Sequence, residues 1–159
     1  MTDKITTCLW FDTEGGEAAQ FYCSLFPSSR IVGVSHYGEA GPRPAGTVLT
    51  VDFELDGRPY VALNGGPEYR FTEAVSFQIS CTDQDEVDRY WTALTADGGE
   101  EGPCGWVKDR FGLSWQVVPT ALPELLSDPD RERANRAMAA MLQMKKLDIA
   151  TLRAAADGG

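Results

Sequence analysis

Short segments in which hydrophobic and polar residues alternate recur along the chain, and they predict β-strands. The clearest segment is 47–55, where Leu49, Val51, Phe53 and Leu55 alternate with polar residues. Asp56-Gly57 follows it directly and predicts a tight hairpin into the next strand. The predicted strands cover residues 5–11, 31–37, 47–55, 58–64, 74–81, 106–109 and 114–118. Pro119 is expected to end the last of them, because proline has no amide hydrogen for the ladder.

Apolar residues spaced three and four apart predict helices. The predicted helices cover about 17–25, 84–96, 122–126, 131–146 and 149–156. Residues 98–105 form the glycine-rich loop between the second helix and the last hairpin. Three methionines in the tail, at 138, 141 and 144, are interpreted as packing or partner-facing residues.

The two halves of the chain are related by a shift of about 69 positions. The shift superposes Thr7 on Ser76, Glu17 on Glu86, Phe21 on Tyr90, Tyr22 on Trp91 and Leu25 on Leu94. A repeat of this length predicts a duplicated βαβββ module rather than a solenoid. We therefore predict an α+β protein with modules at about 5–64 and 74–119 and a helical tail at about 120–156. Residues 1–159 are interpreted as one domain, in which the paired modules curl into a half-open barrel with a pocket between them.

Charge and composition narrow the choice of partners. The net charge of −10 argues against nucleic-acid and anionic-membrane binding, both of which depend on Lys and Arg. No apolar run approaches the roughly 18 residues of a membrane span. The four cysteines form no CxxC pair, which favours reduced thiols in a cytoplasmic protein.

Several motifs together resemble the PhnB-like branch of the vicinal oxygen chelate superfamily, which includes glyoxalases, extradiol dioxygenases and bleomycin-resistance proteins. They are Leu9–Asp12 (LWFD), Phe21–Pro27 (FYCSLFP), Ala62–Pro67 (ALNGGP), Cys104–Gln116 (CGWVKDRFGLSWQ) and, in the tail, Met141–Ile149 (MLQMKKLDI). The resemblance implies the glyoxalase/bleomycin-resistance fold in a bacterial protein. It also implies a homodimer, for which the Met/Ala-rich tail helix would be a suitable partner-facing surface. Members of the branch often carry the name demethylubiquinone methyltransferase.

The resemblance also allows a test for a catalytic metal. Metal-dependent members of the superfamily hold their metal with His and Glu on the first and last strand of each module. Carried onto this chain, those positions lie near Thr7, Val61, Ser76 and Gln116, and none of these is a carboxylate or an imidazole. We therefore expect no catalytic metal and no cofactor.

Other candidate chemistry is sparse. His36 is the only histidine, and any Ser–His or Cys–His system would have to use it. Cys104, in the glycine-rich loop, is the one candidate for a catalytic residue; the alternative is a small residue packed under that loop. Asp52 and Glu54 share one strand face, where a solvated surface is the alternative to paired-carboxylate catalysis. Gly15-Gly16 lies between a strand and a helix, but the order of elements is not that of a doubly wound methyltransferase.

Polar residues near aromatic ones suggest a site for a small amphipathic ligand. The candidate ligand-binding residues are Thr7, Asn64, Ser76, Gln78, Trp106, Trp115 and Gln116, with Asn64 and the two tryptophans at the rim or floor. The leading hypothesis is a metal-free small-molecule-binding protein. One alternative is an enzyme of lyase, isomerase or oxygenase type, which acts on a small oxygenated substrate through a non-standard metal site or Cys104. A second alternative is a structural dimerisation module whose tail recruits a protein partner. The polar residues could also be satisfied interior groups with no ligand.

Overall fold

The computed structural model describes residues 3–159 and divides the chain into two compact units. The first unit ends at Phe71 and the second begins at Thr72. The boundary lies in the loop that the sequence places between the two modules. The interpretation of both units as a single domain with a half-open barrel concerns their mutual placement and stays a prediction.

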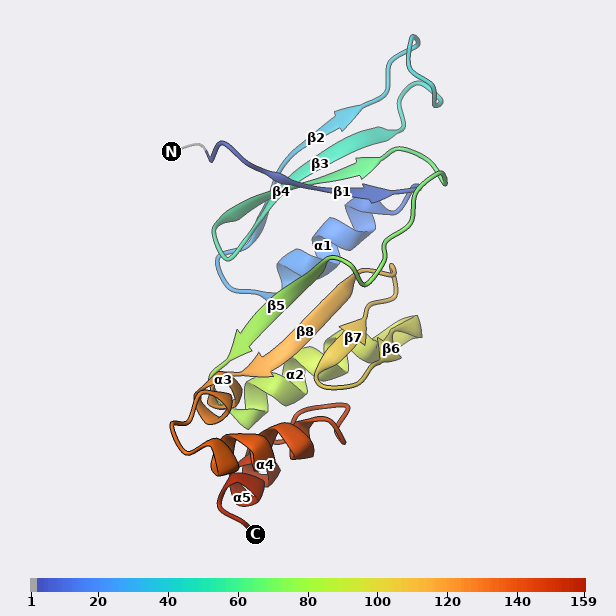
Figure 1. The fold of residues 1–159 in the computed structure, drawn as a ribbon. Helices are drawn as coiled ribbons and strands as arrows, with labels where there is room; N and C mark the ends of the chain where they lie inside the picture. The colour runs from blue at the N-terminus through green and yellow to red at the C-terminus, as the bar shows by residue number, and fades with distance from the viewer. Residues whose placement is uncertain (1–2) are drawn as a thin grey trace. The chain divides into compact units, whose positions relative to one another are not determined.

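The first unit contains one four-stranded mixed sheet and one helix (Figure 1). Its elements are β1 (Thr7–Phe11), α1 (Gly15–Leu25), β2 (Arg30–His36), β3 (Val48–Leu55) and β4 (Arg58–Asn64). The strand order is β1-β4-β3-β2, in which β1 and β4 run parallel and the other neighbours antiparallel. α1 packs on one face of this sheet, where Tyr22 and Phe53 are fully buried.

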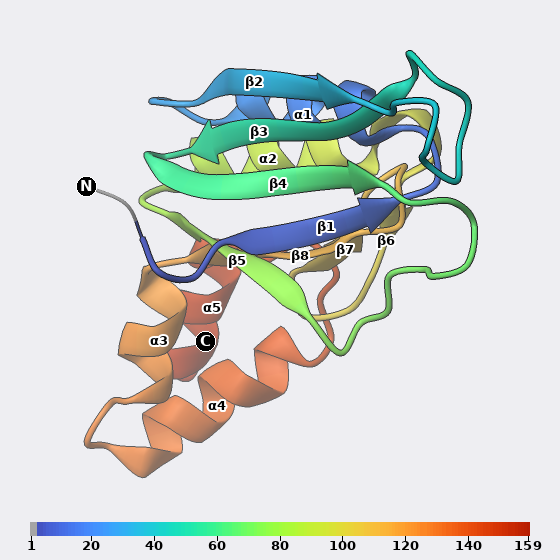
Figure 2. The ribbon, with the colours of Figure 1, turned by 90° about the horizontal axis from the view of Figure 1, so that it is seen from above.

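The second unit repeats this arrangement and adds the tail (Figure 2). Its elements are β5 (Ser76–Cys81), α2 (Gln84–Thr95), the 3-10 turn η1 (Ala96–Gly98), β6 (Glu100–Glu101), β7 (Trp106–Lys108), β8 (Ser114–Pro119), α3 (Ala121–Leu126), α4 (Arg131–Met141) and α5 (Ile149–Ala156). The strand order β5-β8-β7-β6 matches that of the first unit strand for strand, again with the first and last strands parallel. This common topology confirms the α+β fold with two βαβββ modules and helices at the C-terminus.

Two elements differ from the sequence-based expectation. β6 lies in the stretch expected to be loop, since a strand of two glutamates has no hydrophobic alternation and exists only through its pairing with β7. α4 ends at Met141 instead of continuing to about residue 146. The chain turns there because Gln143 and Met144 donate to carbonyls three residues back, so the helical ladder is not continued.

The repeat is offset by 69 residues in the helices but by 70 in the first strands. The helix offset pairs the buried Tyr22 with the buried Trp91, as expected. In the strands, the buried Leu9 and Phe11 correspond to Ile79 and Cys81, because the turn before α2 is one residue shorter than the turn before α1. A one-residue change moves a strand side chain to the opposite face of the sheet. The expected equivalence of Thr7 and Ser76 is therefore corrected: Cys8 corresponds to Gln78.

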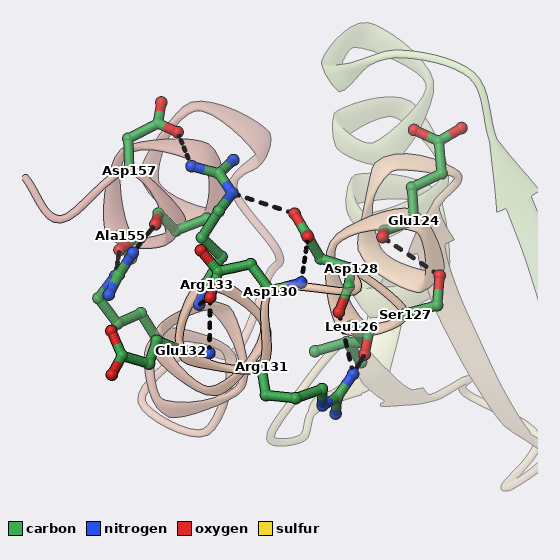
Figure 3. Close-up of polar contacts among 12 residues, drawn as sticks. Glu124, Leu126, Ser127, Asp128, Asp130, Arg131, Glu132, Arg133, Ala155 and Asp157 are labelled. Atoms are coloured by element: carbon green, nitrogen blue, oxygen red, sulfur yellow. Dashed lines mark hydrogen bonds and ion pairs between the residues drawn. The ribbon is translucent and has the colours of Figure 1, made fainter.

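The tail has its own small core and a polar network at its surface. Leu122, Leu147 and Leu152 are buried together, with less buried apolar residues packed around them. Figure 3 shows the network: Arg133 contacts Asp128 at 3.0 Å and Asp157 at 2.6 Å, which links α4 to the segments before it and after α5. Among the helices of residues 3–159, none combines the length and the hydropathy needed to cross a membrane.

Candidate functional site

The face of the second sheet that lies opposite α2 carries a row of polar side chains. On β5 and β8, Ile79, Cys81 and Val117 are buried, so alternation places Ser76, Gln78 and Gln116 on the opposite face. The row is hydrogen-bonded: Gln116 Nε2 donates to Ser76 Oγ at 2.9 Å, and Gln78 Nε2 donates to Gln116 Oε1 at 3.3 Å. The structure thus brings together three of the candidate ligand-binding residues.

Trp106 joins this row from the neighbouring strand. It is the register partner of Gln116 in the β7–β8 ladder, so both side chains stand on one face. Trp106 is half-buried and lines a cavity of about 360 Å³ on this unit. The cavity is lined by Glu73, Glu100, Glu101, Gly102, Pro103, Trp106, Val107, Lys108 and Ser114. The candidate site therefore combines a cavity lined by an indole ring with a carboxamide on the neighbouring strand, at the register partner of that tryptophan.

Charged groups are among the residues that line this cavity. Lys108 Nζ lies 2.6 Å from Glu73 Oε1, and this contact lowers the pKa of Glu73 and raises that of Lys108. Glu100 is the register partner of Lys108 on β6. Glu101 points to the other side of the sheet, where its carboxylate accepts a hydrogen bond from Trp91 Nε1 at 3.1 Å.

Two further candidate residues are buried within their own units. Trp115 follows the alternation of β8 to the α2 side, where it is 2% exposed and donates from Nε1 to Asp109 Oδ2 at 2.9 Å. Asn64 is buried in the first unit, where Oδ1 accepts from the Gly15 amide at 2.8 Å and Nδ2 donates to the Val48 carbonyl at 3.3 Å. Both were expected at the rim or floor of a pocket between the modules, and for Asn64 that placement stays a prediction. The polar groups of both residues form hydrogen bonds within their own modules.

Thr7 lies on β1 of the first unit, on the same strand face as the buried Leu9 and Phe11. The strand partner of Val61 is Cys8 rather than Thr7. The placement of Thr7 in one pocket with residues of the second unit stays a prediction.

The donor set does not fit a divalent metal. The equivalent register pairs on the first and last strands are Cys8–Val61 in the first unit and Gln78–Gln116 in the second. These side chains are a thiol, an isopropyl group and two carboxamides, and partial burial raises the pKa of the Cys8 thiol. Catalytic metal sites need several carboxylate, imidazole or thiolate ligands. Within residues 3–159, no three His, Cys, Asp or Glu side chains are grouped so that they could hold an ion.

The other chemical candidates are placed as follows. Cys104 is half-buried in a tight turn, with a positive φ of 56°, and its amide donates to the Met144 carbonyl. His36 is exposed at the end of β2. On β3, Asp52 is exposed, and Glu54 forms an ion pair with Arg30 at 3.1 Å. Gly15 serves strand–helix packing, since a Cβ there would lie 2.7 Å from Asn64 Oδ1.

Asp109 is a buried carboxylate that supports this face and that the sequence-based prediction did not include. Its Oδ1 accepts from the amides of Phe111 and Leu113, and its Oδ2 accepts from Trp115. This carboxylate fixes the turn between β7, which carries Trp106, and β8, which carries Gln116. The pattern Asp-Arg-Phe-Gly was the available signal, because Asp side chains commonly bond the backbone two residues on in such turns.

Solved structures share this fold. A Bacillus cereus protein, described as a putative 3-demethylubiquinone-9 3-methyltransferase and PhnB protein, is 33% identical with a TM-score of 0.66, and the match covers 74% of this chain and 100% of that one. A Pseudomonas aeruginosa protein is 19% identical with a TM-score of 0.60, covering 74% and 98%. The fosfomycin-resistance protein FosX of Listeria monocytogenes is 15% identical with a TM-score of 0.51, covering 78% and 98%, which is a likeness of fold alone. A search of curated proteins finds no match for the chain.

Paired βαβββ modules of this topology define a protein of the vicinal oxygen chelate superfamily, with the glyoxalase/bleomycin-resistance fold. Residues 3–118 match the family model described as 3-demethylubiquinone-9 3-methyltransferase, which is more than half of the chain. The chain belongs to this family, the PhnB-like branch of the superfamily.

Proposed function

We propose that this protein binds a small amphipathic molecule in the cavity beside Trp106 and does so without a catalytic metal. The observation that carries the proposal is the placement of Trp106 and Gln116 on one sheet face, next to a cavity of about 360 Å³. A flat or apolar part of the ligand would stack on the indole, and its polar groups would bond to the carboxamide row. This volume is at the lower end of the range of small-molecule sites, which suits a compact ligand.

The methyl transfer in the family description is not carried over to this proposal. Methyltransferases of the doubly wound type bind their cofactor at a glycine loop beside a parallel sheet. Here Gly15 packs against Asn64, and both sheets are mixed. A reduced, cytoplasmic environment is part of the proposal, since all four cysteines are free thiols.

The first test is a thermal-shift screen with a broad panel of amphipathic metabolites and antibiotics. A compound at about one hundred times its Kd should stabilise the protein by about 2.7 kcal/mol, which is a readily measured rise in Tm. Trp106→Ala and Gln116→Leu should each weaken binding of a stabilising compound by about tenfold or more, because they remove the stacking surface and the central amide.

Two matched variants control for general effects on the fold. Tyr69→Ala removes an aromatic ring that is 68% exposed in the first unit. Gln143→Leu removes an exposed amide in the tail. Both should bind the compound as the unmodified protein does. A panel in which no compound raises Tm would count decisively against the proposal.

The metal-free part of the proposal has its own measurement. Protein purified without chelators should contain no stoichiometric transition metal by elemental analysis, and its Tm should not respond to added Mn²⁺, Zn²⁺ or Ni²⁺. The physical reason is the missing set of anionic and imidazole ligands. Near-stoichiometric metal, with a melt that shifts on its addition, would instead make an enzyme with non-standard ligands the leading interpretation.

A further inference from the structure

The tail contacts the turn that forms one wall of the cavity. After α4 ends, the chain runs beside residues 103–105, where Cys104 N donates to the Met144 carbonyl and Gly105 N to the Lys145 carbonyl, both at 2.8 Å. Two successive amides of the turn are thus bonded to two successive carbonyls of the tail. A short turn held in this way has little freedom to move without breaking both bonds.

The same turn is bonded to Trp106 and to β8. Trp106 N donates to the Pro103 carbonyl at 3.0 Å, and Gly102 N donates back to the Trp106 carbonyl at 2.9 Å. Gly102 and Pro103 line the cavity together with Trp106. Val117 N donates to the Gly105 carbonyl at 2.8 Å, directly after Gln116. A displacement of the turn would therefore move the cavity wall.

Packing makes this contact specific. Leu147 is fully buried against Gly105, where a Cβ would lie 2.9 Å from Leu147 Cδ1. Gly105 has φ +84°, a conformation that glycine adopts without strain. The missing side chain at 105 thus serves both the turn and the close approach of the tail.

A glutamine at the start of α2 holds the tail segment from its other side. Gln84 Nε2 donates to the Leu147 carbonyl at 3.0 Å, and its Oε1 accepts from the Ile149 amide at 2.9 Å. Lys146 also forms an ion pair with Asp88 of α2 at 2.9 Å. Segment 144–147 is therefore fixed between α2 and the 103–105 turn.

We infer that tail segment 144–147 is a positioning element of the ligand cavity, with Leu147 and Gln84 as its positioning residues. The effect of segment 144–147 on ligand binding rests on the proposed function, whereas its effect on the position of the 103–105 turn does not. The family model matches residues 3–118, so this element lies outside the matched range, although it falls within the tail motif Met141–Ile149. Truncation after Pro119 would accordingly alter the cavity as well as any partner surface on the tail.

The test compares two variants in the full-length protein. Gln84→Ala removes the side-chain bonds to the Leu147 carbonyl and the Ile149 amide, and with them the bond to Asp88, the ion-pair partner of Lys146. Arg133→Gln breaks the ion pairs in Figure 3, which also hold the tail together but do not contact residues 144–147. Leu147→Val, which removes one methylene from the contact with Gly105, provides a milder second variant.

Amide hydrogen exchange at Cys104 and Gly105, followed by NMR, is the first measurement. Exchange at both amides should be about tenfold faster in Gln84→Ala, faster to a smaller degree in Leu147→Val, and unchanged in Arg133→Gln. The indole resonance of Trp106, assigned with Trp106→Phe, should move in the first two variants and stay in place in the third. Equal exchange in all variants, or equal acceleration in Gln84→Ala and Arg133→Gln, would overturn the inference.

The same variants separate this inference from the proposed function. If exchange and the Trp106 signal respond but no compound raises Tm in any variant, the proposed function fails and the positioning role stands. If compounds bind the unmodified protein and Gln84→Ala with equal affinity, the tail segment has no effect on binding and its role in the site is refuted.

Discussion

Asp109 is a buried carboxylate between β7 and β8, and it accepts a hydrogen bond from Trp115, one of the predicted ligand residues. It is 3% exposed and accepts from two backbone amides and one indole. Removing an acceptor of this kind leaves its donors buried and unsatisfied, which costs more than the bonds themselves contribute.

We predict that Asp109→Ala lowers the free energy of unfolding by about 3 kcal/mol or more. Asp109→Asn should cost less, about 1–2 kcal/mol, because Oδ1 is kept while an amide NH₂ faces the indole N–H of Trp115. Urea unfolding of the three proteins measures both values. A loss below about 0.5 kcal/mol in the alanine variant, which is the scale of ordinary surface substitutions, would contradict the structural role.

Single residues also show when the alternation of side chains along a strand is enough to predict a position in the site. Gln116 and Trp115 are adjacent in β8, so one strand cannot present both to the same pocket. The sequence contained this information, and a strict use of the two-residue period would have excluded Trp115. Asn64 is different, because its bond to Gly15 joins residues 49 positions apart and leaves no local signal.

At the scale of single elements, side-chain caps stabilise the start of α2, α4 and α5. Asp83, Asp130 and Asp148 each accept from backbone amides of the helix that follows. The bond from the Thr151 amide is the main cause that lowers the pKa of Asp148 below its ordinary value of 3.8. A folded-state pKa below the unfolded value means that the charged cap stabilises above the unfolded pKa, and that this contribution disappears as the pH falls through the folded pKa.

We predict that Asp148→Ala destabilises the protein by about 1 kcal/mol at about pH 7, and that the difference shrinks as the pH falls below the ordinary value of 3.8. Urea unfolding at a series of pH values measures this difference. Asp148→Asn is the matched control, since it keeps a capping oxygen without a charge and should show a much smaller pH dependence. A constant difference between Asp148→Ala and the unmodified protein across the acid range would refute the assignment of the charged cap.

The end of α4 illustrates a limit of local pattern. Apolar and helix-forming residues continue through Met144, which is why a helix to about residue 146 was expected. The structure ends α4 at Met141 because the following carbonyls bond to the 103–105 turn and Leu147 reaches the core. Tertiary contacts of this kind regularly outweigh intrinsic helix propensity, which amounts to less than about 1 kcal/mol per ordinary residue.

At the scale of the whole molecule, the tail exposes a strip of apolar side chains although the chain carries a net charge of −10. Met138 is 39% exposed and Leu142 is 58% exposed, and their four-residue spacing places them on one side of α4 and its C-cap. The homodimer implied by the family resemblance would cover these side chains.

We predict that the protein is a dimer in solution, with twice the 17.4 kDa mass of the chain by light scattering. Met138→Glu combined with Leu142→Glu should produce a monomer, because charged groups would have to be desolvated in the interface. Ala150→Glu combined with Ala154→Glu adds the same charge to exposed positions of α5 and should leave the dimer intact. If the Met138→Glu/Leu142→Glu variant remained a dimer, another surface would mediate association. If the unmodified protein were a monomer, the prediction would be refuted.

The sequence by itself determined the α+β class, the two βαβββ modules, nearly all strand and helix positions and the family. These features depend on periodicity, caps and turn residues, which are local and are repeated in both halves. Only the tertiary structure decided the strand register, the one-residue offset between the modules, the contact of Asn64 with Gly15, and the attachment of the tail to the cavity wall. Each of these depends on contacts between residues far apart in the chain, such as Gly105 with Leu147. The favourable energy of such a contact comes from the close packing of two surfaces. Neither segment has a local sequence pattern that predicts which other segment it packs against.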